Sequence, residues 1–126
     1  MKFAYNTKYY PPAPRLQIRL GVPDESLKVG PLTAFLDSGA DTTLVPLRYI
    51  RRLPVSVDNL RQLRSQWGES RVVEVYRLDV GIGDIRLPAV QIVADKQGNE
   101  IIVGRNILNL LRVFMDGPKQ IVDISE

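Results

Sequence analysis

The residues best suited to chemistry stand together at Asp37-Ser38-Gly39, directly after an apolar run that ends at Leu36. The chain has no Cys and no His. This excludes a Cys/His or Ser/His nucleophilic site, a zinc site of the usual nitrogen and sulfur ligands, and a disulfide framework. Hydrolytic chemistry would therefore come from carboxylates, hydroxyls or amines. We expect neither a metal ion nor another cofactor.

A second motif lies near the end of the chain, where Ile101-Ile102-Val103 enters Gly104-Arg105-Asn106-Ile107-Leu108. The same sequence pattern, an apolar strand followed by a glycine-containing loop, occurs over residues 35–39 and is consistent with an internal two-fold repeat. Taken with residues 34–45, this motif resembles the retropepsin-like aspartic proteases of retroviruses and bacteria, in element order over most of residues 15–124. The resemblance implies an all-β fold, a closed β-barrel with one or two short helices, and a homodimer that hydrolyses polypeptides as an aspartic endopeptidase.

Peptide hydrolysis without a metal or a covalent nucleophile needs two carboxyl groups. The attacking water must lose a proton while the carbonyl oxygen gains one, so a carboxylate and a carboxylic acid must coexist. Two carboxyls about 3 Å apart cannot both ionise, and the aspartic-protease dyad is the known case from which this magnitude is taken. The chain holds a single Asp-Ser-Gly, so the second Asp37 must come from a second copy related by two-fold symmetry.

The neighbours of Asp37 have distinct roles in this interpretation. Gly39 leaves room for a tight loop in which backbone N–H groups approach the carboxylates, and a Cβ would hinder that approach. The resemblance implies that the Ser38 hydroxyl bonds across the dimer axis, and that Ala40 and Asp41 bind substrate. The alternative for Asp37-Ser38-Gly39 is an ordinary Asx-type turn between two strands, since all three are turn residues.

The resemblance also implies that Arg105 and Asp41 form a basic and acidic pair, in which the arginine orients the acid and the acid accepts from the substrate backbone. A planar, permanently charged guanidinium suits that task. Asn106 follows as a structural hydrogen-bonding group. A purely structural ion pair between Arg105 and Asp41 is the rival interpretation.

Gln66, Trp67 and Gly68 lie where the family has its flap, the hairpin that closes over the substrate and excludes water. This tip differs from the glycine-rich, aliphatic flap of the retroviral enzymes, because it has a single glycine and a bulky tryptophan. Trp67 could contact substrate, or it could be a core or dimer-contact aromatic residue.

Alternating apolar residues and turn residues predict the elements that position these groups. Strands are expected over residues 15–20, 32–36, 42–45, 72–80, 85–94, 101–103, 113–116 and 121–124. Short helices are expected over residues 46–53 and 104–111. Pro88 would lie at a sheet edge or a bulge. The proline-rich residues 1–14 are expected to be an N-terminal arm, followed by one domain over residues 15–126.

Composition narrows the function classes further. Hydrophobic residues make up 44% and charged residues 25% of the chain, which is typical of a soluble globular domain. No apolar run reaches membrane-spanning length and the N-terminus lacks a signal-peptide core, so we expect a cytoplasmic location and no membrane partner. The net charge of +3 comes with no nucleic-acid motif, so no nucleic-acid partner is expected and an RNA-associated function ranks last. The main alternative function is a catalytically silent dimerisation or peptide-binding module of the same fold.

Overall fold

The structure is a computed structural model and describes residues 1–65 and 67–126. Strands dominate these ranges, and both helices are short. The elements are β1 (Lys2–Ala4), β2 (Arg15–Gly21), β3 (Val29–Leu36), β4 (Thr43–Pro46), α1 (Leu47–Ile50), β5 (Asn59–Arg64), β6 (Ser70–Ile82), β7 (Ile85–Asp95), β8 (Ile101–Val103), α2 (Arg105–Leu108), β9 (Arg112–Asp116) and β10 (Ile121–Ser125).

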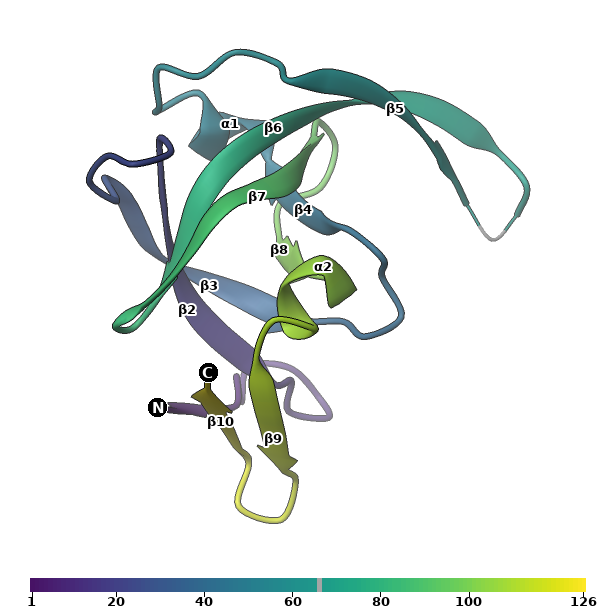
Figure 1. The fold of residues 1–126 in the computed structure, drawn as a ribbon. Helices are drawn as coiled ribbons and strands as arrows, with labels where there is room; N and C mark the ends of the chain where they lie inside the picture. Colours follow the sequence, from purple (N-terminus) through teal and green to yellow (C-terminus); the bar gives the residue numbers. More distant parts are fainter. Residues whose placement is uncertain (66) are drawn as a thin grey trace.

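Six strands close into a barrel (Figure 1). The larger sheet has the order β2-β3-β8-β4-β7-β6-β5, and an additional pairing between β2 and β6 closes the ring. The short β8 is central, because it pairs in parallel with β3 and antiparallel with β4. The predicted all-β, closed barrel with two short helices is confirmed.

The barrel interior follows the alternation seen in the sequence. On β2, Leu16, Ile18 and Leu20 are fully buried in the main core, because successive side chains of a strand point to opposite faces. Ile107 of α2 is buried in the same core. The predicted second helix is shorter than expected, ending at Leu108, and Leu110 beyond it is exposed.

A long hairpin made of β5 and the first half of β6 extends away from the barrel (Figure 1). The sequence did not predict β5, because residues 55–63 lack a clear apolar period. Its pairing with β6, from Asn59↔Val75 to Arg64↔Ser70, makes the strand. On β6, Val72 is exposed, whereas Val73 and Val75 are buried in a small second cluster. They project from the face opposite to that of Tyr76 and Leu78, which face the main core.

Strand β7 lies inside the sheet, between β4 and β6. Of the two expected places for Pro88, a bulge is therefore correct and a sheet edge is not. The β6–β7 register shifts between Leu78 and Val80, and Ala89 takes a positive φ of 47°. A bulge lets a central strand hold a proline that cannot donate to the ladder.

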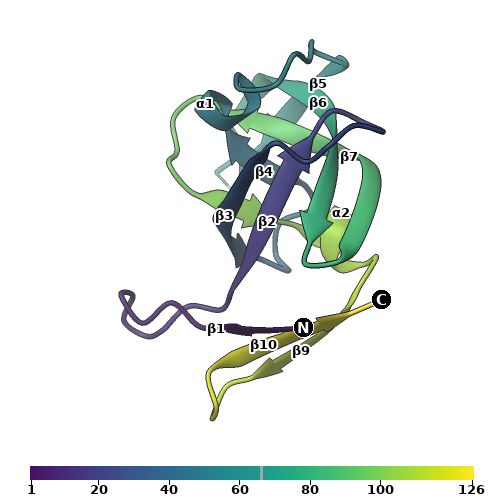
Figure 2. The same ribbon diagram turned by 90° about the vertical axis from the view of Figure 1, so that its left-hand side faces the viewer.

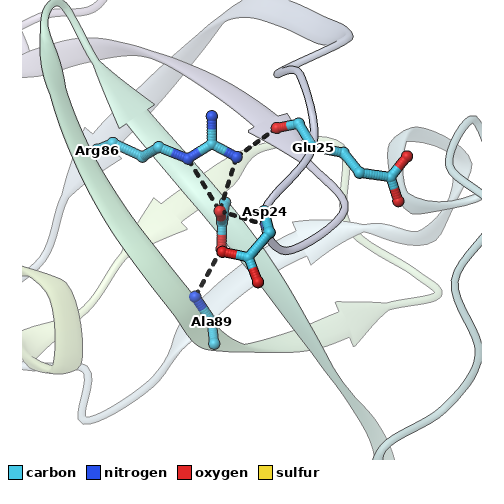
Figure 3. A network of polar contacts seen from close by, with 5 residues as sticks. Asp24, Glu25, Arg86 and Ala89 are labelled. Carbon is cyan, nitrogen blue, oxygen red and sulfur yellow. Dashed lines mark hydrogen bonds and ion pairs between the residues drawn. The ribbon is translucent and has the colours of Figure 1, made fainter.

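A buried carboxylate, Asp79 on β6, fixes this bulge. Figure 3 shows the Arg86 side chain in this network, together with Asp24, Glu25 and Ala89. Its Oδ1 accepts from the N–H of Ala89 at 2.7 Å, and its Oδ2 accepts from the N–H of Asp24 at 3.0 Å. Arg86 donates to Oδ2 from Nε and Nη2, at 2.9 and 2.7 Å, and also to the carbonyl oxygen of Glu25. Burial by itself raises the pKa of Asp79, but these hydrogen bonds and the Arg86 charge together hold the pKa below its ordinary value.

The two ends of the chain form a separate three-stranded sheet, in the order β1-β10-β9 (Figure 2). Lys2–Ala4 pairs with Ile121–Asp123 of β10, so the segment predicted as an arm contributes a strand. The rest of that segment is a loop that leaves β1 and returns to β2 (Figure 2). An isolated bridge between Asn6 and Ala13 closes this loop.

Candidate active site

Asp37 stands on the loop that joins β3 to β4, at the end of the predicted apolar strand. Its N–H donates to the carbonyl oxygen of Val103 at 3.0 Å, which extends the β3–β8 ladder by one residue. Its carbonyl accepts from the N–H of Ala40 at 3.1 Å, and its Oδ1 accepts from the N–H of Gly39 at 2.9 Å. The carboxylate is thus oriented by its own turn, and the Asp37, Ser38 and Gly39 residues are all exposed.

The second sequence motif crosses directly behind this loop. The N–H of Arg105 donates to the carbonyl oxygen of Ala40 at 2.8 Å. A Cβ on Gly104 would lie 2.1 Å from the carbonyl oxygen of Thr42, a distance that no side chain can adopt. Glycine is therefore required here by the close approach of two chain segments. The structure brings the two motifs together, as their resemblance to one family implied.

Thr43 connects the two segments from inside the fold, and sequence reasoning did not single it out. It is fully buried. Its Oγ1 accepts from the N–H of Gly104 at 3.1 Å and donates to Oδ1 of Asn106 at 2.7 Å. The Asn106 amide in turn donates to the carbonyl oxygen of Gln91 on β7 at 2.9 Å. A hydroxyl residue at a core-facing position of β4 was the only signal for this role in the sequence.

The expected contact between Arg105 and Asp41 is not made. Arg105 instead donates from Nη1 to the carbonyl oxygen of Ser38 at 2.7 Å. No ion pair joins it to Asp41 among the residues that the structure describes. Both side chains are exposed. In this arrangement the guanidinium supports the Asp37 loop through its backbone.

An apolar hollow of about 490 Å³ includes Asp37 and Ser38 in its lining. Its other lining residues come from β2, β3, α2 and β9 and the segments beside them: Pro14, Leu36, Leu108, Leu111, Val113 and Met115. Met115 remains 53% exposed and its neighbour Phe114 64% exposed. The chain therefore leaves apolar surface open beside Asp37.

The hairpin tip is described for Trp67 and Gly68, while the predicted site residue Gln66 lies outside the described residues. Ser65 and Glu69 close the turn through a hydrogen bond of 2.7 Å between N–H and carbonyl oxygen. Gly68 has a φ of 84°, which a glycine adopts without strain. Trp67 is 82% exposed, so the interpretation of Trp67 as a core residue of its own subunit is wrong.

Within the described ranges, no cluster of three or more carboxylate, His or Cys side chains is arranged to hold a metal ion. No helix of the described residues is long and apolar enough to span a membrane.

Solved structures share this fold. A retropepsin-like aspartic protease from Rickettsia conorii matches with a TM-score of 0.67 and 15% identity, over 97% of this chain and 86% of that chain. The Simian Foamy Virus (mac) protease matches with a TM-score of 0.53 and 18% identity, over 75% of this chain and 91% of that chain. The EIAV protease complexed with the inhibitor HBY-793 matches with a TM-score of 0.53 and 19% identity, over 85% of this chain and 92% of that chain. The fold is thus that of a retropepsin-like aspartic protease.

The family model described as gag-polyprotein putative aspartyl protease matches residues 27–110, which include Asp37 and the second motif. The chain therefore belongs to this family of retropepsin-like aspartic proteases. Among curated proteins, no sequence matches.

Proposed function

We propose that the protein is an aspartic endopeptidase that acts as a homodimer, with Asp37 of two copies forming one catalytic dyad. The observation that carries the proposal is the Asp37 carboxylate, which is exposed at the end of β3 and already oriented by the Gly39 N–H. One chain supplies one such carboxylate, and the reaction needs two. Membership of the aspartyl protease family supports the assignment.

The dyad would hydrolyse a peptide bond in two steps. One Asp37 carboxylate takes a proton from water as the water oxygen bonds to the carbonyl carbon, while the other, protonated Asp37 gives its proton to the carbonyl oxygen. The tetrahedral diol then loses its C–N bond, a hydroxyl proton returns to the dyad, and the amine nitrogen leaves with a proton from the other carboxyl. The dyad again holds one proton at the end.

The remaining predicted site residues have proposed roles around this dyad. Ser38 and Gly39 hold the two loops at the dimer axis. Ala40 and Asp41 bind the substrate backbone. The β5–β6 hairpin, with Gln66, Trp67 and Gly68 at its tip, acts as the flap. The exposed position of Trp67 supports this flap role.

Arg105 and Asn106 give structural support in the proposal, and their hydrogen bonds to Ser38 and Gln91 are in keeping with it. The open apolar surface that includes Met115 supports association of two copies, because an exposed apolar patch marks an interaction site. The homodimer and the cytoplasmic location are parts of this proposal.

The decisive experiment compares Asp37→Asn with the wild type on a peptide library. We expect Asp37→Asn to lose hydrolysis while keeping its fold, because the change is nearly isosteric and removes only the proton chemistry. Asp84→Asn is the matched control, since Asp84 is exposed in the turn between β6 and β7 and should keep full turnover. Equal hydrolysis by Asp37→Asn and wild type would contradict the mechanism. Peptide binding without hydrolysis by the wild type would favour the silent binding module.

A further inference from the structure

The face of β3 that carries Asp37 also carries Phe35. Ala34 belongs to the main core and Leu36 packs against it, whereas Phe35 does neither. Side chains alternate along a strand, and Asp37 continues the β3 ladder through its N–H. Phe35 and Asp37 therefore project from the same face, about 7 Å apart along the strand at the usual rise per residue.

An apolar row crosses the sheet from Phe35 on this face. Phe35 pairs with Ile102, Ile102 pairs with Leu44, and Leu44 pairs with Val93. Directly paired residues of neighbouring strands project from the same face. Val93 and Leu44 belong to the small second cluster, which includes Leu63 of the hairpin. The row thus runs from Phe35 on β3, the strand that ends at Asp37, to the base of the proposed flap.

Tyr9, from the loop between β1 and β2, closes the β3 end of this row. Its ring meets the Phe35 ring edge-on, with centroids 5.1 Å apart and planes at 71°. Tyr9 is still 41% exposed, so the aromatic pair presents open surface. The segment that the sequence presented only as an arm therefore supplies a wall beside the site.

Glu100 directly precedes β8 and stands two residues before Ile102, the partner of Phe35, so its side chain projects from the same face as Phe35. Burial raises the pKa of Tyr9, and hydrogen bonding and the negative charge of Glu100 raise it further. Asn99, the residue before Glu100, is fixed by Arg48, which donates hydrogen bonds to its side-chain oxygen and its carbonyl oxygen, both at 3.3 Å. Glu100 is exposed and takes part in none of the ion pairs formed by the described residues.

We propose that Tyr9, Phe35 and Glu100 form a specificity subsite that takes a lysine or arginine side chain of the polypeptide substrate. The inference rests on the proposed endopeptidase function. The aliphatic stem of such a side chain lies against the aromatic pair, and its cationic head meets both the aromatic rings and the Glu100 carboxylate, which takes part in no ion pair among the described residues. Neither an acidic nor a short polar side chain gains both contacts.

The test uses pairs of peptides that differ only in lysine or norleucine, placed in turn at each position flanking the scissile bond. We expect the wild type to prefer lysine at one position. Glu100→Gln should reduce that preference about 1.4- to fivefold, the range expected for one exposed ion pair. Glu100→Lys should reverse the preference toward a third peptide of the series, which carries glutamate at the same position. Glu25→Gln removes the same charge from an exposed loop at the far end of β3 and should leave the preference unchanged.

Two variants of Tyr9 separate the ring from the hydroxyl. Tyr9→Leu should weaken the lysine preference, and Tyr9→Phe should retain it, because the ring face attracts the cation. Cleavage with the same residue preference in the wild type, Glu100→Gln and Tyr9→Leu would overturn the subsite. Binding of the same peptide pairs to Asp37→Asn, measured by calorimetry, tests the subsite without turnover. Lysine peptides that bind no better than norleucine peptides would overturn the subsite. This result is separate from a failure of the wild type to cleave peptides, which would overturn the endopeptidase proposal.

Discussion

The substitution Thr43→Val tests the polar connection behind the Asp37 loop. Valine keeps the shape of threonine but removes the hydroxyl, which accepts a hydrogen bond from the Gly104 N–H at 3.1 Å and donates one to the Asn106 Oδ1 at 2.7 Å. Both groups would then lack a partner beside a fully buried position. Each buried polar group left unpaired costs about 1 to 3 kcal/mol.

We expect a loss of about 3 kcal/mol in the free energy of unfolding, toward the lower end of the summed range, because Asn106 is only half-buried and water can reach it. For a chain of 126 residues, the usual entropy of unfolding per residue converts 1 kcal/mol to about 4 °C in Tm. The expected decrease in Tm is therefore about 12 °C. Differential scanning calorimetry at one fixed protein concentration measures it, because the proposed dimerisation would make Tm depend on concentration.

Thr33→Val is the matched control, since Thr33 is exposed on β3 and the same substitution there should change stability by about 0.5 kcal/mol or less. Activity gives a second measurement. Because Thr43 and Asn106 support the loop without touching the dyad, Thr43→Val should lower turnover while the pH profile keeps its shape. A Tm for Thr43→Val equal to that of Thr33→Val would refute the reasoning.

Four further outcomes are expected. Specific activity should fall when the protein is diluted below its dimer dissociation constant, and added Asp37→Asn subunits should suppress activity beyond simple dilution. Rates strictly proportional to the wild-type protein concentration, across a range where size-exclusion measurements detect dissociation, would argue against a shared site. The rate should be bell-shaped with pH and centred below neutrality, because one dyad member must be ionised and the other protonated, and a rate rising steadily into alkaline pH would contradict the dyad. Gly104→Ala should prevent stable folding, since its Cβ would meet the Thr42 carbonyl oxygen at 2.1 Å, while Gly117→Ala, with no atom within 4 Å, serves as the tolerated control in thermal unfolding. Asp79→Asn should lower the free energy of unfolding by about 2 to 4 kcal/mol at neutral pH. Because the folded state lowers the pKa of Asp79, the difference from wild type should be full above the ordinary aspartate pKa of 3.8 and shrink as the pH falls below it, and a difference independent of pH would show that the charge is irrelevant.

Local patterns determined the strands and the chemistry of the chain. Alternating residues such as Leu16, Ile18 and Leu20 predicted β2 because burial on one face of a strand requires a period of two. The absence of Cys and His and the Asp-Ser-Gly triplet directed attention to Asp37, since residue type alone limits which reactions a side chain can perform. The two motifs together identified the family that the fold and the family model then confirmed.

Contacts between distant segments were decided only by the tertiary structure. Strand β5 forms because β6 pairs with it, whereas its own sequence has no clear period. Arg105 supports the Ser38 carbonyl and not Asp41, and the two partners lie 67 residues apart in the chain. Tyr9 reaches Phe35 across the β1–β2 loop in the same way. A sequence pattern reports which face of an element is buried, but the barrel closure determines which residues meet across it, because those neighbours are set by packing of the whole chain.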